Sequence, residues 1–131
     1  VAIVPYSPLG RGFLTGKLTS PRQFGQSDYR KNIPLFQPGN FEANLDIVKE
    51  LEKIAASKKC KASQVALAWL NAQGHDVFPI PGTKRLTYLE ENINSLKITL
   101  TIDELNRINN FSLRVRGERK NDEGMQLVDR S

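Results

Sequence analysis

The chain has 131 residues, of which 39% are hydrophobic and 25% are charged, a balance that is typical of one soluble globular domain. Its net charge of +5 comes from 19 Lys and Arg residues scattered among 14 Asp and Glu residues, which favours solvated helix faces over a nucleic-acid-binding stripe. No apolar run approaches the ~20 residues of a membrane span, and the single cysteine excludes an internal disulfide. We therefore expect a cytoplasmic protein with neither a membrane nor a nucleic acid as partner.

The first segment, Ala2–Tyr6, is a short, continuous apolar run that predicts a buried strand of a parallel sheet. Pro5 cannot donate to a ladder and is tolerated where a strand leaves the sheet. The chain opens on Val1 rather than on a methionine and enters this strand at once. We therefore expect a fragment or a processed piece of a longer protein.

A turn-rich stretch, residues 7–16, follows the first strand. Residues 15–40 show no sustained period and are interrupted by prolines and glycines, so they predict a long, ordered loop. Because the loop also carries Phe24, Tyr29 and Phe36, we expect it to pack against the rest of the chain.

Two helices are predicted next, at residues 41–59 and 63–73. The first has one apolar stripe at three- and four-residue steps, and the second is apolar nearly all round, which indicates burial between layers. Trp69 is expected in the core, and Gly74 is a plausible C-cap. The stripe of the first helix consists of Leu45, Val48, Leu51, Ile54 and Ala55.

A second short apolar strand is predicted at Val77–Ile80, and an amphipathic helix at Leu86–Leu96. Thr101 and Glu104 form a capping box that opens a last helix, and residues 114–131 have weak periodicity. Two buried strands cannot make a stable parallel sheet alone, so the sequence requires neighbouring strands that it does not contain. The inner face of the last helix is expected to consist of Ile102, Leu105, Ile108 and Phe111.

Self-contained acid/base catalysis has no support in the residue pattern. His75 is the single histidine and stands in a polar turn, where a solvent-exposed position is expected. No cluster of His, Cys and Asp has metal-ligand spacing, so we predict no metal, and a serine nucleophile would lack a base.

Both predicted strands end in loops that are candidates for ligand binding, because α/β barrels place their sites at the carboxyl ends of strands. Thr83, Lys84 and Arg85 precede a predicted helix, whose free N–H groups and dipole favour an anion such as phosphate. The alternative is that Lys84 and Arg85 form an ordinary solvated pair, and local chemistry alone leaves both possibilities open.

Two long motifs resemble the aldo-keto reductase family, most closely its plant and fungal auxin-induced-like or pyridoxal-reductase-like branch. They are YSPLGRGFLTGK at residues 6–17 and IPGTKRLTYLEENI at residues 80–93. The similarity runs along nearly the whole chain, through NLDIVKELEKIA and QVALAWLNAQG to the final VRGER.

The resemblance implies an α/β fold in which residues 1–131 are the C-terminal part of a (β/α)8 TIM barrel, incomplete as a barrel, with its last two strands, their helices and the tail. It also implies NADP as cofactor. The tyrosine at position 6 would stack on the nicotinamide, the loop after it would wrap the pyrophosphate, the Thr-Lys-Arg segment would hold the 2′-phosphate, and the Glu-Asn pair would contact adenine. The implied cofactor-binding residues are Tyr6, Ser7, Pro8, Leu9, Gly10, Arg11, Gly12, Thr83, Lys84, Arg85, Glu91 and Asn92.

The family's catalytic aspartate, tyrosine, lysine and histidine have no match in this chain, so no catalytic residue is assigned here. The complete protein is expected to be an NADPH-dependent oxidoreductase that reduces aldehydes and ketones, while this chain alone is expected to be inactive without the N-terminal half of the barrel. The alternative is a non-enzymatic NADP-binding member of the superfamily, like the β subunits of potassium channels. Two positions depart from the usual family pattern: Lys61-Ala62, which should weaken the cap of the buried helix by about 1 kcal/mol, and Lys120-Asn121 in the tail, which leaves the substrate preference open.

Overall fold

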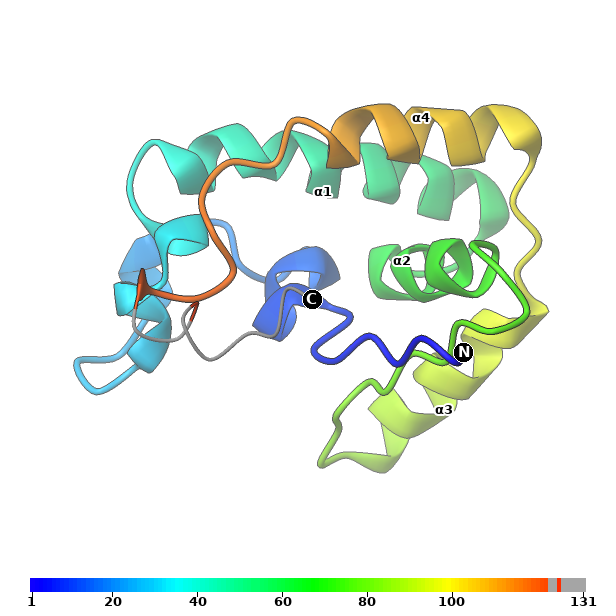
Figure 1. Ribbon diagram of the computed structural model, residues 1–131, viewed down its shortest axis with the longest axis horizontal. Coiled ribbons are helices and arrows are strands. Elements are labelled where there is room, and N and C mark those ends of the chain that lie inside the picture. Colours follow the sequence, from blue (N-terminus) through cyan, green and yellow to red (C-terminus); the bar gives the residue numbers. More distant parts are fainter. Residues whose placement is uncertain (123–124, 126–131) are drawn as a thin grey trace.

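The computed structural model describes residues 1–122 and 125. The described part of the chain has four α-helices: α1 (Asn40–Lys58), α2 (Ala62–Asn71), α3 (Leu86–Asn94) and α4 (Ile102–Ser112). Helices α1 and α4 lie side by side, and α2 packs between α1 and α3 (Figure 1). Short 3₁₀ helices occupy Gly10–Thr15, Pro21–Gln23, Tyr29–Asn32, Pro34–Phe36 and Ser95–Lys97.

The two predicted strands are not confirmed, because the described residues contain only isolated bridges. Ile3 pairs with Val77 and Tyr6 pairs with Ile80, both in parallel. The two predicted segments therefore do run side by side in the expected direction, joined by hydrogen bonds such as Phe78 N to Ile3 O at 2.8 Å. Prolines at positions 5 and 79 have no N–H to donate, and a single parallel pair has no third segment to extend it into a sheet.

The expected burial of these two segments is wrong as well, since the side chains of Ile3 and Phe78 are 56% and 55% exposed. Parallel strands are normally covered on both faces, and in the described chain neither segment has that cover. The apolar side of α3 is also open to solvent. The large apolar residues exposed on these elements are Ile3, Val4, Phe78, Ile80, Leu86, Leu89 and Ile93.

The helical core forms as the periodicity predicts. Leu51 and Ile54 of α1 pack against Val65 and Ala66 of α2 and Ile108 of α4, and all five are almost fully buried. Helix α2, predicted at residues 63–73, is buried along its first seven residues, 62–68, in keeping with its apolar composition. Burial of this kind contributes about 1.5–3 kcal/mol for each large aliphatic side chain.

A second core cluster, formed by aromatic rings, attaches the long loop to α1. Phe13 packs edge-on against Phe36 and Phe41, with ring centroids 5.8 and 5.3 Å apart. Phe24 meets the Phe36 ring at 5.3 Å. The expected packing of the loop is therefore confirmed for Phe24 and Phe36, whereas Tyr29 stays 61% exposed.

The helix ends follow the sequence signals only in part. Glu104 N donates to Thr101 Oγ1, and the Glu104 carboxylate accepts from Thr101 N at 2.7 Å, so the capping box is present. Ile102 is 76% exposed, so its place on the inner face of α4 was predicted wrongly. The C-cap of α2 is Ala72 rather than Gly74, because the helix ends earlier than its apolar pattern.

The segment after α4 returns to the long loop and is held by one buried side chain. Asn44 on α1 accepts a hydrogen bond from Arg116 N and donates one to Arg116 O, both at 2.8 Å. Leu35 N donates to Glu118 O at 3.2 Å, which joins the loop directly to this segment. The loop is therefore fixed on one side by aromatic packing and on the other by the returning chain.

Candidate cofactor-binding site

A hollow of about 480 Å³ lies between the turn after the first bridged segment, the long loop, the start of α2, and α3. It brings together residues from both family-like motifs, which are far apart in the sequence. Those of the predicted cofactor-binding residues that line it are Ser7, Pro8, Leu9, Arg11, Gly12, Glu91 and Asn92.

The turn on one side of the hollow has an unusual backbone. Ser7, Gly10, Arg11 and Gly12 all have positive φ, at 48°, 57°, 54° and 93°. Glycine adopts this conformation without a steric cost, so positions 10 and 12 suit it. Hydrogen bonds from Gly10 N to Ser7 O and from Gly12 N to Leu9 O close the turn, which brings backbone close to the hollow.

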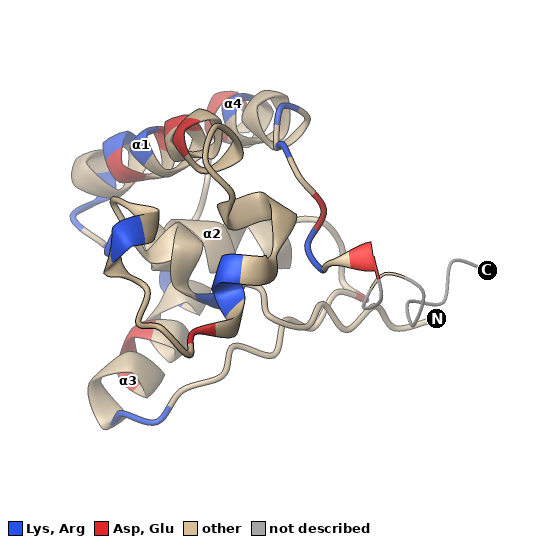
Figure 2. Cartoon of the chain, turned by 90° about the vertical axis from the view of Figure 1, so that its left-hand side faces the viewer, with Lys and Arg blue, Asp and Glu red and all other residues tan. Residues whose placement is uncertain are grey.

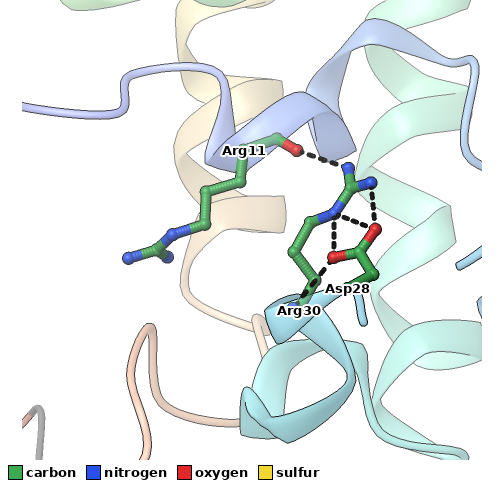
Figure 3. Close-up of polar contacts among 3 residues, drawn as sticks. All are labelled: Arg11, Asp28 and Arg30. Atoms are coloured by element: carbon green, nitrogen blue, oxygen red, sulfur yellow. Dashed lines mark hydrogen bonds and ion pairs between the residues drawn. The ribbon is translucent and has the colours of Figure 1, made fainter. Parts of the chain in front are cut away.

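Arg30, a residue not predicted from the sequence, reinforces this turn (Figure 3). Its guanidinium donates to both carboxylate oxygens of Asp28 and, through Nη1, to Arg11 O at 3.1 Å. The hydrogen bonds from Arg30 hold the pKa of the Asp28 carboxyl below its ordinary value. The Arg11 side chain points the other way, and its Nη1 donates to Arg119 O at 2.7 Å.

Lys17 and Tyr88 meet across the hollow, one from the loop side and one from α3. Lys17 Nζ donates to the Tyr88 hydroxyl at 2.6 Å, and this contact lowers the pKa of Tyr88. Within residues 1–122 and 125, no ion pair involves Lys17 or Arg11. Both cations are therefore available to an anionic ligand.

Lys61 and Glu91 form an ion pair on the wall of the same hollow. The backbone carbonyl of Glu91 accepts from Gln64 Nε2 at 2.9 Å, which ties α3 to the start of α2. Neither Lys61 nor Lys17 was assigned a role from the sequence. For Lys17 the sequence offers one signal, its position within the first motif, and for Lys61 it offers none.

The predicted phosphate-binding residues lie just outside this hollow. Arg85 is the N-cap of α3, and its N–H donates to Thr83 Oγ1 at 3.2 Å. Lys84 lines a second, more open hollow of about 810 Å³, which adjoins the first because both are lined by Arg11, Arg30 and glycine 82. The first turn of α3 has no acidic residue, and no ion pair among residues 1–122 and 125 involves Lys84 or Arg85.

Tyr6 and Gly10 do not line either hollow. The Tyr6 ring is 42% exposed and has two cations over it, Arg119 at 5.4 Å and Lys120 at 5.7 Å from the ring centroid. The returning segment after α4 therefore lies next to the predicted nicotinamide position.

Other kinds of site find no support in the described residues. They contain no group of three or more His, Cys, Asp and Glu residues able to hold a metal ion, and no helix in them is long and apolar enough to cross a membrane. His75 is exposed, as expected. Both acidic and basic residues lie on α1 and α4, which therefore do not form a single basic stripe (Figure 2).

The arrangement of helices is that of part of an α/β barrel, because the structural neighbours of this chain are aldo-keto reductases with the TIM-barrel fold. One is glycerol dehydrogenase from Gluconobacter oxydans, with a TM-score of 0.77 at 29% identity, which covers 88% of this chain and 35% of that one. Another is a thermostable aldo-keto reductase in complex with epalrestat, with a TM-score of 0.57 at 24% identity over 85% of this chain and 30% of that one, a likeness of fold alone.

The chain belongs to the aldo/keto reductase family, whose sequence model matches residues 1–112. It is 52% identical over 101 residues to aldo-keto reductase yakc [NADP(+)] of Schizosaccharomyces pombe, which is 77% of this chain and 30% of that protein. It is 43% identical over 131 residues to aldo-keto reductase str7 of Strobilurus tenacellus, covering 98% of this chain and 39% of that protein. The chain thus spans about a third of the length of these relatives.

Proposed function

We propose that this chain carries the NADP-binding site of an oxidoreductase that reduces aldehydes and ketones to alcohols with NADPH. The observation that carries the proposal is the hollow built by the two family-like motifs, where Arg11 and Lys17 have no carboxylate partner among the described residues. The similarity to a relative that is named for NADP(+) supports the same cofactor.

The residues present fit a phosphorylated dinucleotide. Arg11, Lys17 and the tight backbone of the turn offer charge and N–H groups for a pyrophosphate. Lys84 and Arg85, beside the N-terminus of α3, suit the 2′-phosphate that distinguishes NADP from NAD. When bound, NADPH would supply a hydride, and the chain's own residues would bind the cofactor and orient it.

The exposed apolar residues of the two bridged segments and α3 fit the same proposal. In a closed barrel each strand is paired on both edges and covered by helices, so these side chains would be buried. We expect the rest of a reductase barrel to provide that cover. A cytoplasmic location stays a prediction.

The test compares two forms of the protein. Full-length protein should bind NADPH, seen as quenching of intrinsic fluorescence, and should consume it with a reactive aromatic aldehyde. Residues 1–131 alone should show no turnover, because the catalytic residues of the family have no match here. Binding without turnover by the full-length protein would favour the non-enzymatic alternative, and absence of binding would refute the proposal.

One contact makes that test sharper. The Lys17–Tyr88 pair is a tyrosine with a lowered pKa next to a lysine, which is an arrangement suited to proton transfer. If residues 1–131 do turn over NADPH, a Tyr88→Phe variant identifies the source. Loss of that activity with NADPH binding unchanged would make Tyr88 a general acid and refute our assignment of the chain to cofactor binding only.

A further inference from the structure

Lys61 reaches from the start of α2 to the Glu91 carboxylate on α3, on the wall of the hollow. The Lys61 side chain is 58% exposed, whereas that of Glu91 is 18% exposed and is fixed from behind by the hydrogen bond from Gln64 to its backbone carbonyl. The backbone of α3 is therefore tied to α2 at Glu91, the Glu91 carboxylate is the more buried partner, and the ammonium is the more exposed one.

Capping of α2 does not explain the Lys61 side chain. Lys61 is the N-cap residue, but it makes no side-chain capping hydrogen bond, and its N–H is satisfied by Gln64 Oε1 at 3.0 Å. A cation at a helix N-terminus is also unfavourable with the helix dipole. The contact with Glu91 is thus the feature of Lys61 that calls for a role in the site.

Charge decides which part of a dinucleotide would face Glu91. Phosphates are attracted to Arg11 and Lys17, which have no ion pair among the described residues, and are repelled by a carboxylate, so the Glu91 side of the hollow suits the neutral base. A carboxylate only accepts hydrogen bonds and an ammonium only donates them. Side by side, Glu91 and Lys61 offer one acceptor and one donor to the edge of a purine.

Adenine presents a 6-amino donor beside the N1 acceptor, and hypoxanthine presents a 6-oxo acceptor beside an N1–H donor. A paired carboxylate and ammonium can satisfy either pattern. With adenine the carboxylate accepts from the amino group and the ammonium donates to N1, and with hypoxanthine the carboxylate accepts from N1–H and the ammonium donates to the oxo group. A carboxylate alone can accept from the amino group but repels the oxo group, because the carboxylate oxygen and the oxo oxygen are both hydrogen-bond acceptors.

We propose that Lys61 is a specificity-determining residue that lets the base end of this hollow accept a purine with either a 6-amino or a 6-oxo group. This inference rests on the proposed NADP-binding function. The Glu91 carboxylate can itself accept from a 6-amino group, whereas a 6-oxo group needs the Lys61 ammonium.

The experiment measures dissociation constants of NADPH and of its analogue with hypoxanthine in place of adenine, using the full-length protein. The unaltered protein should bind the two within about threefold, a difference well under that of one charge-assisted hydrogen bond. Lys61→Met should weaken both cofactors, since either base loses a bond from the ammonium, but it should weaken the hypoxanthine analogue about tenfold more than NADPH, because only in the analogue does an oxygen then face the carboxylate.

Two further variants serve as controls. Lys49→Met removes an exposed lysine that pairs with Asp46 on α1, outside the hollow, and should leave both affinities unchanged. Lys61→Ser removes the ammonium but supplies a capping hydroxyl to α2, so it should show the same selectivity as Lys61→Met without loss of stability.

Three outcomes would overturn the inference. One is an unaltered protein that already rejects the hypoxanthine analogue as strongly as the Lys61 variants do. A second is an equal loss of both cofactors in those variants, which would make Lys61 a general electrostatic contact. If the unaltered protein binds neither cofactor, the proposed function itself is wrong and this inference falls with it.

Discussion

Gly117 lies so close to Pro34 that a Cβ added to the glycine would stand 2.6 Å from the proline carbonyl carbon. Its φ of +82° is also a conformation that other residues rarely adopt. The chain after α4 can therefore return to the long loop only because position 117 has no side chain.

We predict that Gly117→Ala destabilises the protein by about 1–3 kcal/mol, since strain and a backbone clash act together. The control is Gly25→Ala in the long loop, where an added Cβ would meet no atom within 4 Å. Urea denaturation of both variants measures the difference. Equal stability of the two variants would show that the loop can shift away from residue 117 at little cost.

Lys84→Ala and Arg85→Ala should weaken NADPH about tenfold to 150-fold and NADH much less, because only NADPH carries the 2′-phosphate and a charge-assisted contact is worth about 1.5–3 kcal/mol. The double variant should lose less than the sum, since both side chains would share one phosphate. Fluorescence titrations at fixed salt give the dissociation constants. Equal losses for the two cofactors would mean that Lys84 and Arg85 are an ordinary solvated pair.

Replacing Lys17 with methionine should raise the pKa of Tyr88 towards its ordinary value of 10.0, because the hydrogen bond and charge of Lys17 lower it. The measurement is an ultraviolet titration of tyrosinate, with Tyr88→Phe subtracted to isolate this residue. Arg22→Met, an exposed substitution elsewhere in the loop, should leave the titration unchanged. An unchanged pKa of Tyr88 in the Lys17 variant would contradict the contact.

Glu104 should make stability dependent on pH. Its partial burial opposes ionisation, but hydrogen bonds from Thr101 N and Lys58 outweigh it and lower the pKa below the ordinary 4.5. The stabilisation by the charged form is therefore complete above pH 4.5 and is lost as the pH falls through the folded-state pKa.

Glu104→Gln keeps a side chain that can cap α4 but removes the charge. It should cost about 1 kcal/mol of unfolding free energy at pH 7, and the difference should shrink towards pH 3. Asp46→Asn, which breaks an exposed pair with Lys49, should have little effect at either pH. A Glu104→Gln effect that is independent of pH would show that shape rather than charge is responsible.

The helices could be predicted from the sequence because their burial repeats with the helical period. Leu51 and Ile54 are buried as their spacing requires, and the capping box at Thr101 forms locally, within four residues. The strands could not be confirmed, because a strand such as Val77–Ile80 depends on neighbours on both edges.

The residues of the candidate site could also be predicted only in part. Residues of the two motifs, such as Arg11 and Glu91, could be assigned through the family resemblance, and the hollow brings them together. Arg30 and Lys61 lie between the motifs, in segments whose local pattern says nothing about a ligand. They reach the site because the long loop and α2 fold back towards it, and that arrangement cannot be read from local hydrophobic periodicity.

The hydrogen bonds between Asn44 and Arg116 also bear on the order in which the protein matures during synthesis. The two residues are 72 positions apart, so at about 5–20 residues per second the ribosome adds Arg116 roughly 4–14 s after Asn44. During that interval the aromatic cluster can hold the loop against α1, but the Asn44 amide has no backbone partner from Arg116. The loop beside the hollow therefore gains its second attachment only late in translation, and a nascent chain that stalls before Arg116 would present an incompletely fixed cofactor site.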